Sequence, residues 1–174
     1  MPNIEERDHT LGPADAEVSL LEFGDFQCPH CAAAYATVKQ LQQELGESMR
    51  FAFREFPLTN IHKYAEMAAE SAEAAAAQGK FWEMHDYLFE HQEELSPEML
   101  DAAADKLGLD GVRITQEVNE RAHSWRVLED MESGRKEGVH GTPTFFINGV
   151  QHKGAFDVES LMRAIDSHRD SAAA

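Results

Sequence analysis

The 174-residue chain has the length of one domain and a globular composition, with 43% hydrophobic and 27% charged residues. Its 32 Asp and Glu against 15 Lys and Arg give a formal net charge of −17, which disfavours nucleic-acid and anionic membrane partners. No apolar run approaches the roughly 18 residues of a membrane helix, and the N-terminus lacks the apolar core of a signal peptide. We therefore expect a cytoplasmic protein, or a periplasmic or secreted one if a leader was removed.

The first part of the chain predicts a βαβ unit. Val18–Phe23 is short, apolar and rich in β formers, which indicates a buried central strand. From Cys28 onward apolar residues recur at helical spacing until Gly46, a typical helix end. Met49–Arg54 alternates apolar and charged residues with period two, which predicts a half-exposed strand. The unit is complete by residue 56, and its crossover is expected to be right-handed.

A helical block follows, because strand formers become rare and Ala, Glu, Gln and Leu dominate. The best-marked helix begins at the N-cap Ser96, has Pro97 at its first position and ends at Gly108. The predicted helices of the block cover residues 62–78, 80–91, 97–107 and, as one or two helices, about 110–136. We interpret the block as an insertion packed on the sheet and not as a second independent domain.

Strand signals return after Gly138. Residues 144–147 and 150–153 flank Asn148-Gly149, which is the strongest short signal for a β-hairpin. Asp157 is the predicted N-cap of a last helix, whose apolar stripe consists of Val158, Leu161, Met162 and Ile165. The order β-α-β, helical block, β-β-α predicts an α/β fold with a mixed central sheet and helices on both faces.

The chain has two cysteines, Cys28 and Cys31, in the motif Cys-Pro-His-Cys where a predicted strand ends and a helix begins. Unpaired N–H groups at a helix N-terminus stabilise a thiolate on Cys28. Pro29 suits the first turn, and a protonated His30 would add a positive charge nearby. Cys31 lies one turn further along the same side, within disulfide reach. The pair predicts a redox-active disulfide, with no metal and no other cofactor.

A lowered pKa of Cys28 would make this pair more oxidising. If the pKa falls from about 8.5 to about 5, the stabilisation at pH 7 is roughly 2.7 kcal/mol, or about 60 mV for a two-electron couple.

Three alternative interpretations of the cysteine pair are weaker. A structural disulfide closing about four residues would contribute only roughly 2 kcal/mol, and half a zinc site lacks further ligands at short spacing, since the 9 histidines are scattered. A chance pair of inert thiols is the third.

Two other positions stand out. Pro143, at the start of the predicted strand 144–147, donates no N–H and forces Thr142 into an extended conformation. A cis bond between them is a candidate, but spacing alone favours trans. Glu22 is an acid in an otherwise apolar strand, six residues before Cys28, where its burial would be costly. A functional role and a Glu that faces an edge of the sheet both remain open for it.

Four segments resemble the DsbA-like branch of the thioredoxin superfamily, and the similarity covers nearly all of residues 9–166. They are Phe23–Cys31, Arg54–Leu58, Phe81–Leu88 and Gly141–Gly149. The resemblance implies a thioredoxin fold made by residues 1–60 and 136–174, with an inserted all-helical subdomain over residues 61–135.

The resemblance also implies roles for single residues. It makes Cys28 the nucleophile and Cys31 the resolving thiol. It implies a cis bond before Pro143, facing the cysteines, with the main chain beside Thr142 pairing with extended client peptides. It places Glu22 at the family's buried acidic position behind the active site, which implies a role in proton relay.

The function implied is that of a protein disulfide oxidoreductase, exchanging disulfides with protein or peptide thiols and served by an unidentified redox recycling partner. The alternative is a non-catalytic redox-sensing or regulatory thioredoxin-like module. The compartment sets the direction of flow, because a strong oxidant would be mostly reduced in a cytosol poised near about −220 to −320 mV. We expect a monomer.

Overall fold

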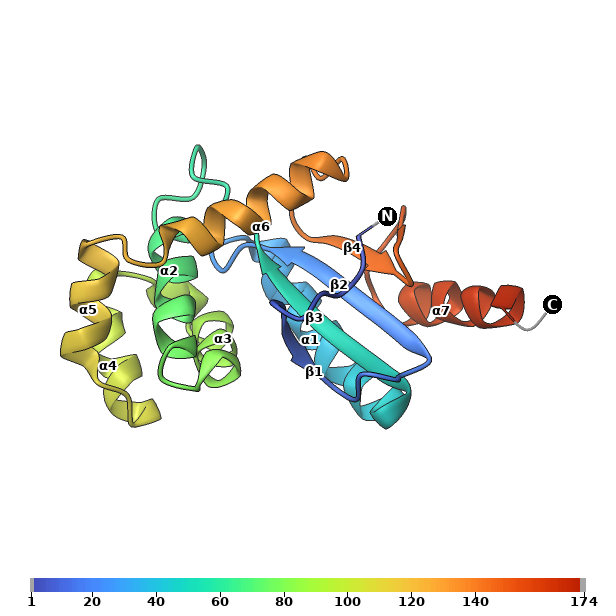
Figure 1. Ribbon diagram of the computed structural model, residues 1–174, viewed down its shortest axis with the longest axis horizontal. Coiled ribbons are helices and arrows are strands. Elements are labelled where there is room, and N and C mark those ends of the chain that lie inside the picture. Colours follow the sequence, from blue (N-terminus) through green and yellow to red (C-terminus); the bar gives the residue numbers. More distant parts are fainter. Residues whose placement is uncertain (1, 173–174) are drawn as a thin grey trace.

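A computed structural model describes residues 2–172 of the chain (Figure 1). Within this range five strands form one sheet in the order β1-β3-β2-β4-β5. The strands are β1 His9–Leu11, β2 Val18–Gly24, β3 Met49–Glu55, β4 Thr144–Ile147 and β5 Val150–Gln151. β2 and β3 are parallel and the other neighbouring pairs are antiparallel, so the predicted mixed sheet is confirmed.

The α-helices of the described range follow the predicted order. They are α1 Pro29–Leu45, α2 Ala65–Ala76, α3 Phe81–Glu90, α4 Pro97–Leu107, α5 Gly111–Asn119, α6 Ser124–Lys136 and α7 Val158–Ala172. In Figure 1 the helices α2 to α5 gather beside the sheet, at the left of the view, and α6 runs from this group to the sheet. The exact limits of the insertion, residues 61 and 135, stay a prediction.

Both faces of the central strands are covered. Successive side chains of a strand point to opposite faces, and on β2 Leu20 belongs to the large apolar core that includes α1 and α7. Phe23 instead belongs to a smaller core with Phe56 and Met131 of α6. A Cβ at Gly134 of α6 would lie 3.0 Å from the rings of Phe23 and Phe56. The glycine therefore lets α6 pack directly on the sheet.

Local signals place the helix ends as predicted. Ser96 Oγ accepts a hydrogen bond from the N–H of Met99 at 3.3 Å at the start of α4, and Gly108 ends this helix at a φ of 65°. Asp157 Oδ1 accepts from the N–H of Ser160 at 2.9 Å at the start of α7. Side-chain caps and a left-handed glycine satisfy backbone groups that the helix itself leaves unpaired.

Two features of the sheet differ from the prediction. The strand β1 is absent from the predicted elements, because three residues carry too little of a period-two pattern and β1 exists through its pairing with β3. The prediction that β3 is half-exposed is wrong, since Arg54 and Glu55 are each 1% exposed. The physical reason is that β3 lies between β1 and β2 and is covered by α6 as well.

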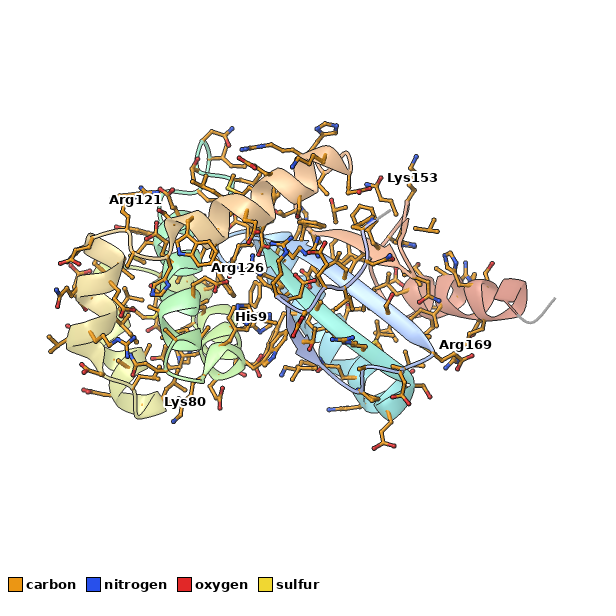
Figure 2. The ribbon with its side chains drawn as sticks, in the orientation of Figure 1. His9, Lys80, Arg121, Arg126, Lys153 and Arg169 are labelled. Carbon is orange, nitrogen blue, oxygen red and sulfur yellow. The ribbon has the colours of Figure 1, made fainter. Side chains whose placement is uncertain are left out.

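The buried charge of Arg54 is neutralised by Asp8. Its Nε and Nη2 donate to Oδ1 and Oδ2 of Asp8 at 2.9 and 2.7 Å, and the two side chains are 1% and 0% exposed. Arg126 lies where α6 meets the sheet (Figure 2) and pairs with Asp130, whose Oδ2 accepts from the N–H of Glu55 at 3.1 Å. The Arg54–Asp8 pair fixes the N-terminal segment to β3, and the hydrogen bond between the N–H of Glu55 and Asp130 fixes α6 to it.

Asp8→Ala removes the bidentate partner of a buried arginine. We expect the free energy of unfolding, measured by urea denaturation, to fall by about 3–5 kcal/mol, because Arg54 keeps its charge and loses its only buried carboxylate partner, while the exposed Glu5 remains 3.6 Å away. Glu159→Ala is the control, since the Glu159–Arg163 pair is 83% and 73% exposed and such pairs contribute about 0–1 kcal/mol. Equal losses in the two variants would contradict this role of Asp8.

Candidate active site

The two cysteines lie where β2 gives way to α1. Cys28 is the residue before the helix and Pro29 is the first residue within it, as predicted. Both thiols are free, and Cys28 is 4% exposed whereas Cys31 is fully buried. Pro29 and His30 are exposed beside them. Cys28 is therefore the more accessible of the two thiols.

Cys28 is a thiol that ionises below neutral pH, with its pKa lowered from 9.0 to about 5. The largest cause is a hydrogen bond with the Cys31 thiol, and desolvation opposes it. The side chain of Thr142 and the backbone N–H groups of Cys31 and His30 lower this pKa further. His30 thus lowers the pKa of Cys28 through its backbone N–H at the helix N-terminus. An effect of the charge on its ring stays a prediction.

A distant segment completes the surroundings of Cys28. The Thr142–Pro143 peptide bond is cis, as the resemblance implies. Cys28 Sγ lies 3.5 Å from the carbonyl oxygen of Thr142, to which it can donate only in its protonated form. The segment arrives there because β4 pairs with β2, with Thr144 opposite Phe23. The sheet register therefore brings the cis-proline to the cysteines.

Glu22 lies buried on β2, at 2% exposure, and within residues 2–172 its Oε1 has no hydrogen-bond partner. Its strand is flanked by β3 and β4, which excludes a Glu that faces an edge of the sheet. Burial, and after it the charge of Cys28, raises the pKa of Glu22 to about 8. Burial also raises the pKa of Cys31 well above 9.0, with Glu22 contributing. At pH 7 the charge therefore sits on Cys28.

A small cavity adjoins Glu22. It measures about 10 Å³, and its lining includes Tyr35 and Lys39 of α1 together with His85 and Asp86 of α3. This is about the volume that one water needs. Lys39 and Asp86 form an ion pair of 2.5 Å, and their side chains are 38% and 30% exposed. The cavity therefore joins the buried carboxyl group to a pair that touches solvent.

The turn before Cys28 is held by side chains that no sequence pattern singled out. Gln92 Nε2 donates to the carbonyl oxygens of Phe26 and Cys28 at 2.6 and 2.9 Å. Gln27 Oε1 accepts from the N–H of Tyr64 at 2.6 Å. Gln92 lies 64 positions from Cys28 and Tyr64 lies 37 from Gln27. Local sequence carries no signal for contacts at such separations.

Among residues 2–172 no group of three or more His, Cys, Asp or Glu side chains is placed to hold a metal ion. In the same range no helix has the length and hydrophobicity needed to cross a lipid bilayer.

The β2–α1–β3 unit, the Cys-x-x-Cys pair at the start of α1 and the cis-proline beside it define a thioredoxin-fold protein. The family model described as thioredoxin matches residues 5–167. The chain therefore belongs to the thioredoxin family.

Three solved structures illustrate this likeness. A thioredoxin-like oxidoreductase from Silicibacter pomeroyi has a TM-score of 0.81 at 26% identity, over 95% of this chain and 94% of that chain. BdbD from Bacillus subtilis has a TM-score of 0.82 at 23% identity, over 91% and 90%. The thiol-disulfide exchange protein α-DsbA2 from Wolbachia pipientis has a TM-score of 0.80 at 24% identity, over 94% and 88%. The predicted thioredoxin fold is confirmed.

Similar curated proteins are much longer. The Na⁺/H⁺ antiporter NhaA 3 of Salinispora tropica is 44% identical over 167 residues, which cover 96% of this chain and 26% of that protein. NhaA 1 of Mycolicibacterium vanbaalenii is 40% identical over 168 residues, covering 94% and 27%. The chain thus spans about a quarter of the length of these relatives.

Glu22→Gln should change how stability depends on pH. Between a pKa of 4.5 when unfolded and about 8 when folded, the folded protein holds a proton that the unfolded chain has released, so stability falls as pH rises. The glutamine variant lacks this loss. Its unfolding free energy relative to wild type should increase by about 1.4 kcal/mol per pH unit from about pH 5 to 8, and then level off.

Denaturant titrations at several pH values measure this difference. Glu6→Gln is the matched control, because Glu6 is an exposed glutamate, and its curve should run parallel to wild type throughout. A parallel curve for Glu22→Gln as well would contradict the raised pKa.

Proposed function

We propose that this chain is a thiol-disulfide oxidoreductase that exchanges disulfides with protein or peptide thiols through Cys28 and Cys31. The observation that carries the proposal is the unequal pair: Cys28 has a pKa of about 5, while the pKa of the neighbouring Cys31 is raised well above 9.0. One thiol is thus ready to attack or to leave at neutral pH while the other keeps its proton. The named activities of the structural relatives, oxidoreductase and thiol-disulfide exchange, support it.

The exchange proceeds in two balanced steps. The Cys28 thiolate attacks a client disulfide, so that a bond forms between Cys28 Sγ and one client sulfur while the client S–S bond breaks and its other sulfur leaves as a thiolate. Cys31 then loses its proton and attacks Cys28 Sγ, which forms the Cys28–Cys31 disulfide and releases the second client sulfur as a thiolate. Oxidation of a client runs through the same steps in reverse.

The main chain beside Thr142 is the proposed docking place for the client. The Thr142 carbonyl oxygen lies 3.5 Å from Cys28 Sγ, so a peptide strand that pairs with this segment carries its cysteine to the nucleophile. Pro143 donates no N–H of its own to that pairing. Exposed Pro29 and His30 form the rim on the other side of Cys28.

Glu22 is proposed to carry the proton of Cys31. Cys31 must be a thiolate to attack. In the mixed disulfide Cys28 carries no charge, so one of the two causes that raise the pKa of Glu22 to about 8 is absent, and the carboxylate that accepts the proton becomes more populated. Its charge already acts on the pKa of Cys31. The cavity toward Lys39 and Asp86 has room for about one water, which offers a route for that proton to solvent.

Cys31→Ser should trap clients on Cys28, because the mixed disulfide then has no resolving thiol. At about pH 6 Cys28, with its pKa of about 5, is mostly thiolate while most free client thiols are protonated. We expect covalent adducts that disappear on reduction, seen by non-reducing electrophoresis, and loss of turnover in insulin reduction. Cys28→Ser should trap nothing. Absence of adducts in Cys31→Ser would count against the exchange reaction.

Glu22→Gln should slow resolution by Cys31 without slowing attack by Cys28. A glutamine accepts no proton, so the rate of resolution should be reduced by about tenfold near pH 7 and approach the wild-type rate as hydroxide replaces the carboxylate at higher pH. Stopped-flow exchange with a chromogenic disulfide measures both steps. An unchanged pH profile of resolution would remove Glu22 from the mechanism.

A second candidate is a non-catalytic redox-sensing or regulatory module. It is favoured by the relatives named as Na⁺/H⁺ antiporters, of which the chain spans about a quarter. This alternative predicts poor turnover with protein substrates and a change of affinity for a partner when Cys28 and Cys31 are oxidised. Steady-state turnover separates the two. The cytoplasmic location, the monomeric state and the recycling partner stay predictions.

A further inference from the structure

The carboxylate of Asp25, three residues before Cys28, is a firmly held group that the exchange steps above do not use. Asp25 is fully buried. Its Oδ1 accepts from the N–H of Gln27 at 2.7 Å. Its Oδ2 accepts from the N–H of Leu58 at 2.8 Å and lies 2.7 Å from Nδ1 of His62. A buried carboxylate with this many donors is compensated for its loss of hydration.

The donors come from two parts of the chain. Gln27 belongs to the turn that leads into Cys28, whereas Leu58 and His62 belong to the segment between β3 and α2. The side chain of Asp25 therefore ties the active-site turn to that segment. The hydrogen bond with Gln27 spans two positions of the chain. Those with Leu58 and His62 span 33 and 37 positions.

The backbone of Asp25 faces the site. Its N–H donates to Sγ of Cys31 at 3.4 Å. Burial, Cys28 and Glu22 all raise the pKa of Cys31, and this N–H lowers it. A donor fixed at a sulfur stabilises the thiolate more than the thiol, because hydrogen bonds to charged acceptors are the stronger ones.

We infer that Asp25 is a positioning residue for the resolving step, holding its own N–H on Cys31 Sγ while that sulfur becomes a thiolate and attacks the mixed disulfide on Cys28. The inference rests on the proposed function and deepens it. The N–H stays on Asp25 throughout: the proton that leaves is that of the Cys31 thiol, the Cys28–Cys31 bond forms, and the client sulfur departs. His62 supports the arrangement by holding the carboxylate from the neighbouring segment.

Reaction of the reduced protein with an aromatic disulfide that releases a coloured thiolate tests this in one stopped-flow trace. Attack by Cys28 releases the first coloured thiolate, and resolution by Cys31 releases the second. In Asp25→Ala we expect the second phase to slow by about tenfold or more, the effect of a lost hydrogen bond to a charged group. The first phase should stay within about twofold. The pH at which the second phase reaches half of its maximal rate should rise. Cys28 and Glu22 also titrate at this site, so this shift is measured relative to their own midpoints.

Two further variants keep the test sharp. Asp25→Asn retains one acceptor oxygen and should restore part of the rate of the second phase. His62→Ala changes no residue of the turn but removes one partner of the Asp25 carboxylate. It should slow the second phase by a smaller factor, about threefold, and it replaces Asp25→Ala in the test if that variant does not fold. Asp15→Ala removes an exposed carboxylate and should change neither phase.

The outcomes separate the two proposals. Equal slowing of both phases, or no slowing of either, in folded Asp25 and His62 variants would overturn the positioning role and leave the exchange reaction standing. A wild-type protein that releases only the first thiolate would instead overturn the proposed function. Slowing confined to the second phase, with partial rescue by Asp25→Asn, supports the inference.

Discussion

The chemistry of this site depends on one constraint: Glu22, Cys28 and Cys31 influence one another's ionisation, and of these three only Cys28 is negatively charged at neutral pH. Cys28 takes that charge, because hydrogen bonds from Cys31 and from the start of α1 outweigh its desolvation. Glu22 and Cys31 lack such compensation, and burial keeps both protonated at neutral pH. The proposed nucleophile, resolving thiol and proton carrier are therefore distinguished by their surroundings, since two of the three are the same kind of side chain.

The sheet supplies these surroundings. β2 carries Glu22 and ends beside the cysteines, and its pairing with β4 brings Thr142 and Pro143 within reach of Cys28. On the other face Arg54 of β3 forms an ion pair with Asp8 of the N-terminal segment and donates a hydrogen bond to Ser133 of α6. The buried charge of Arg54 has a bidentate partner in Asp8. Near the cysteines, in contrast, the buried Oε1 of Glu22 has no hydrogen-bond partner among the described residues. A buried acid without a partner destabilises the fold. The same burial raises the pKa of Glu22 to about 8, so that this group titrates near neutral pH.

The helical block also contributes to the site. Gln92 holds two carbonyl oxygens of the active-site turn, Tyr64 holds the side chain of Gln27, and His62 holds Asp25. The turn is thus supported from a part of the chain that is distant in sequence and outside the βαβ unit. In the proposed exchange reaction such support would keep the N–H donors in place at the cysteine sulfurs, because hydrogen bonds weaken steeply as their geometry is distorted.

Sequence by itself determined the features whose causes lie within a few positions of one another. The two ends of α4, the start of α7, the hairpin at Asn148-Gly149 and the placement of Cys28 at a helix N-terminus all follow from short-range hydrogen bonding and backbone preference. The resemblance to a family added the cis bond before Pro143. Only the tertiary structure decided that Arg54 and Glu55 are buried, that β1 exists and that Asp25 meets His62. Those features depend on partners 37 to 75 positions away, and the free energy of burial is set by what covers a residue and not by its neighbours along the chain.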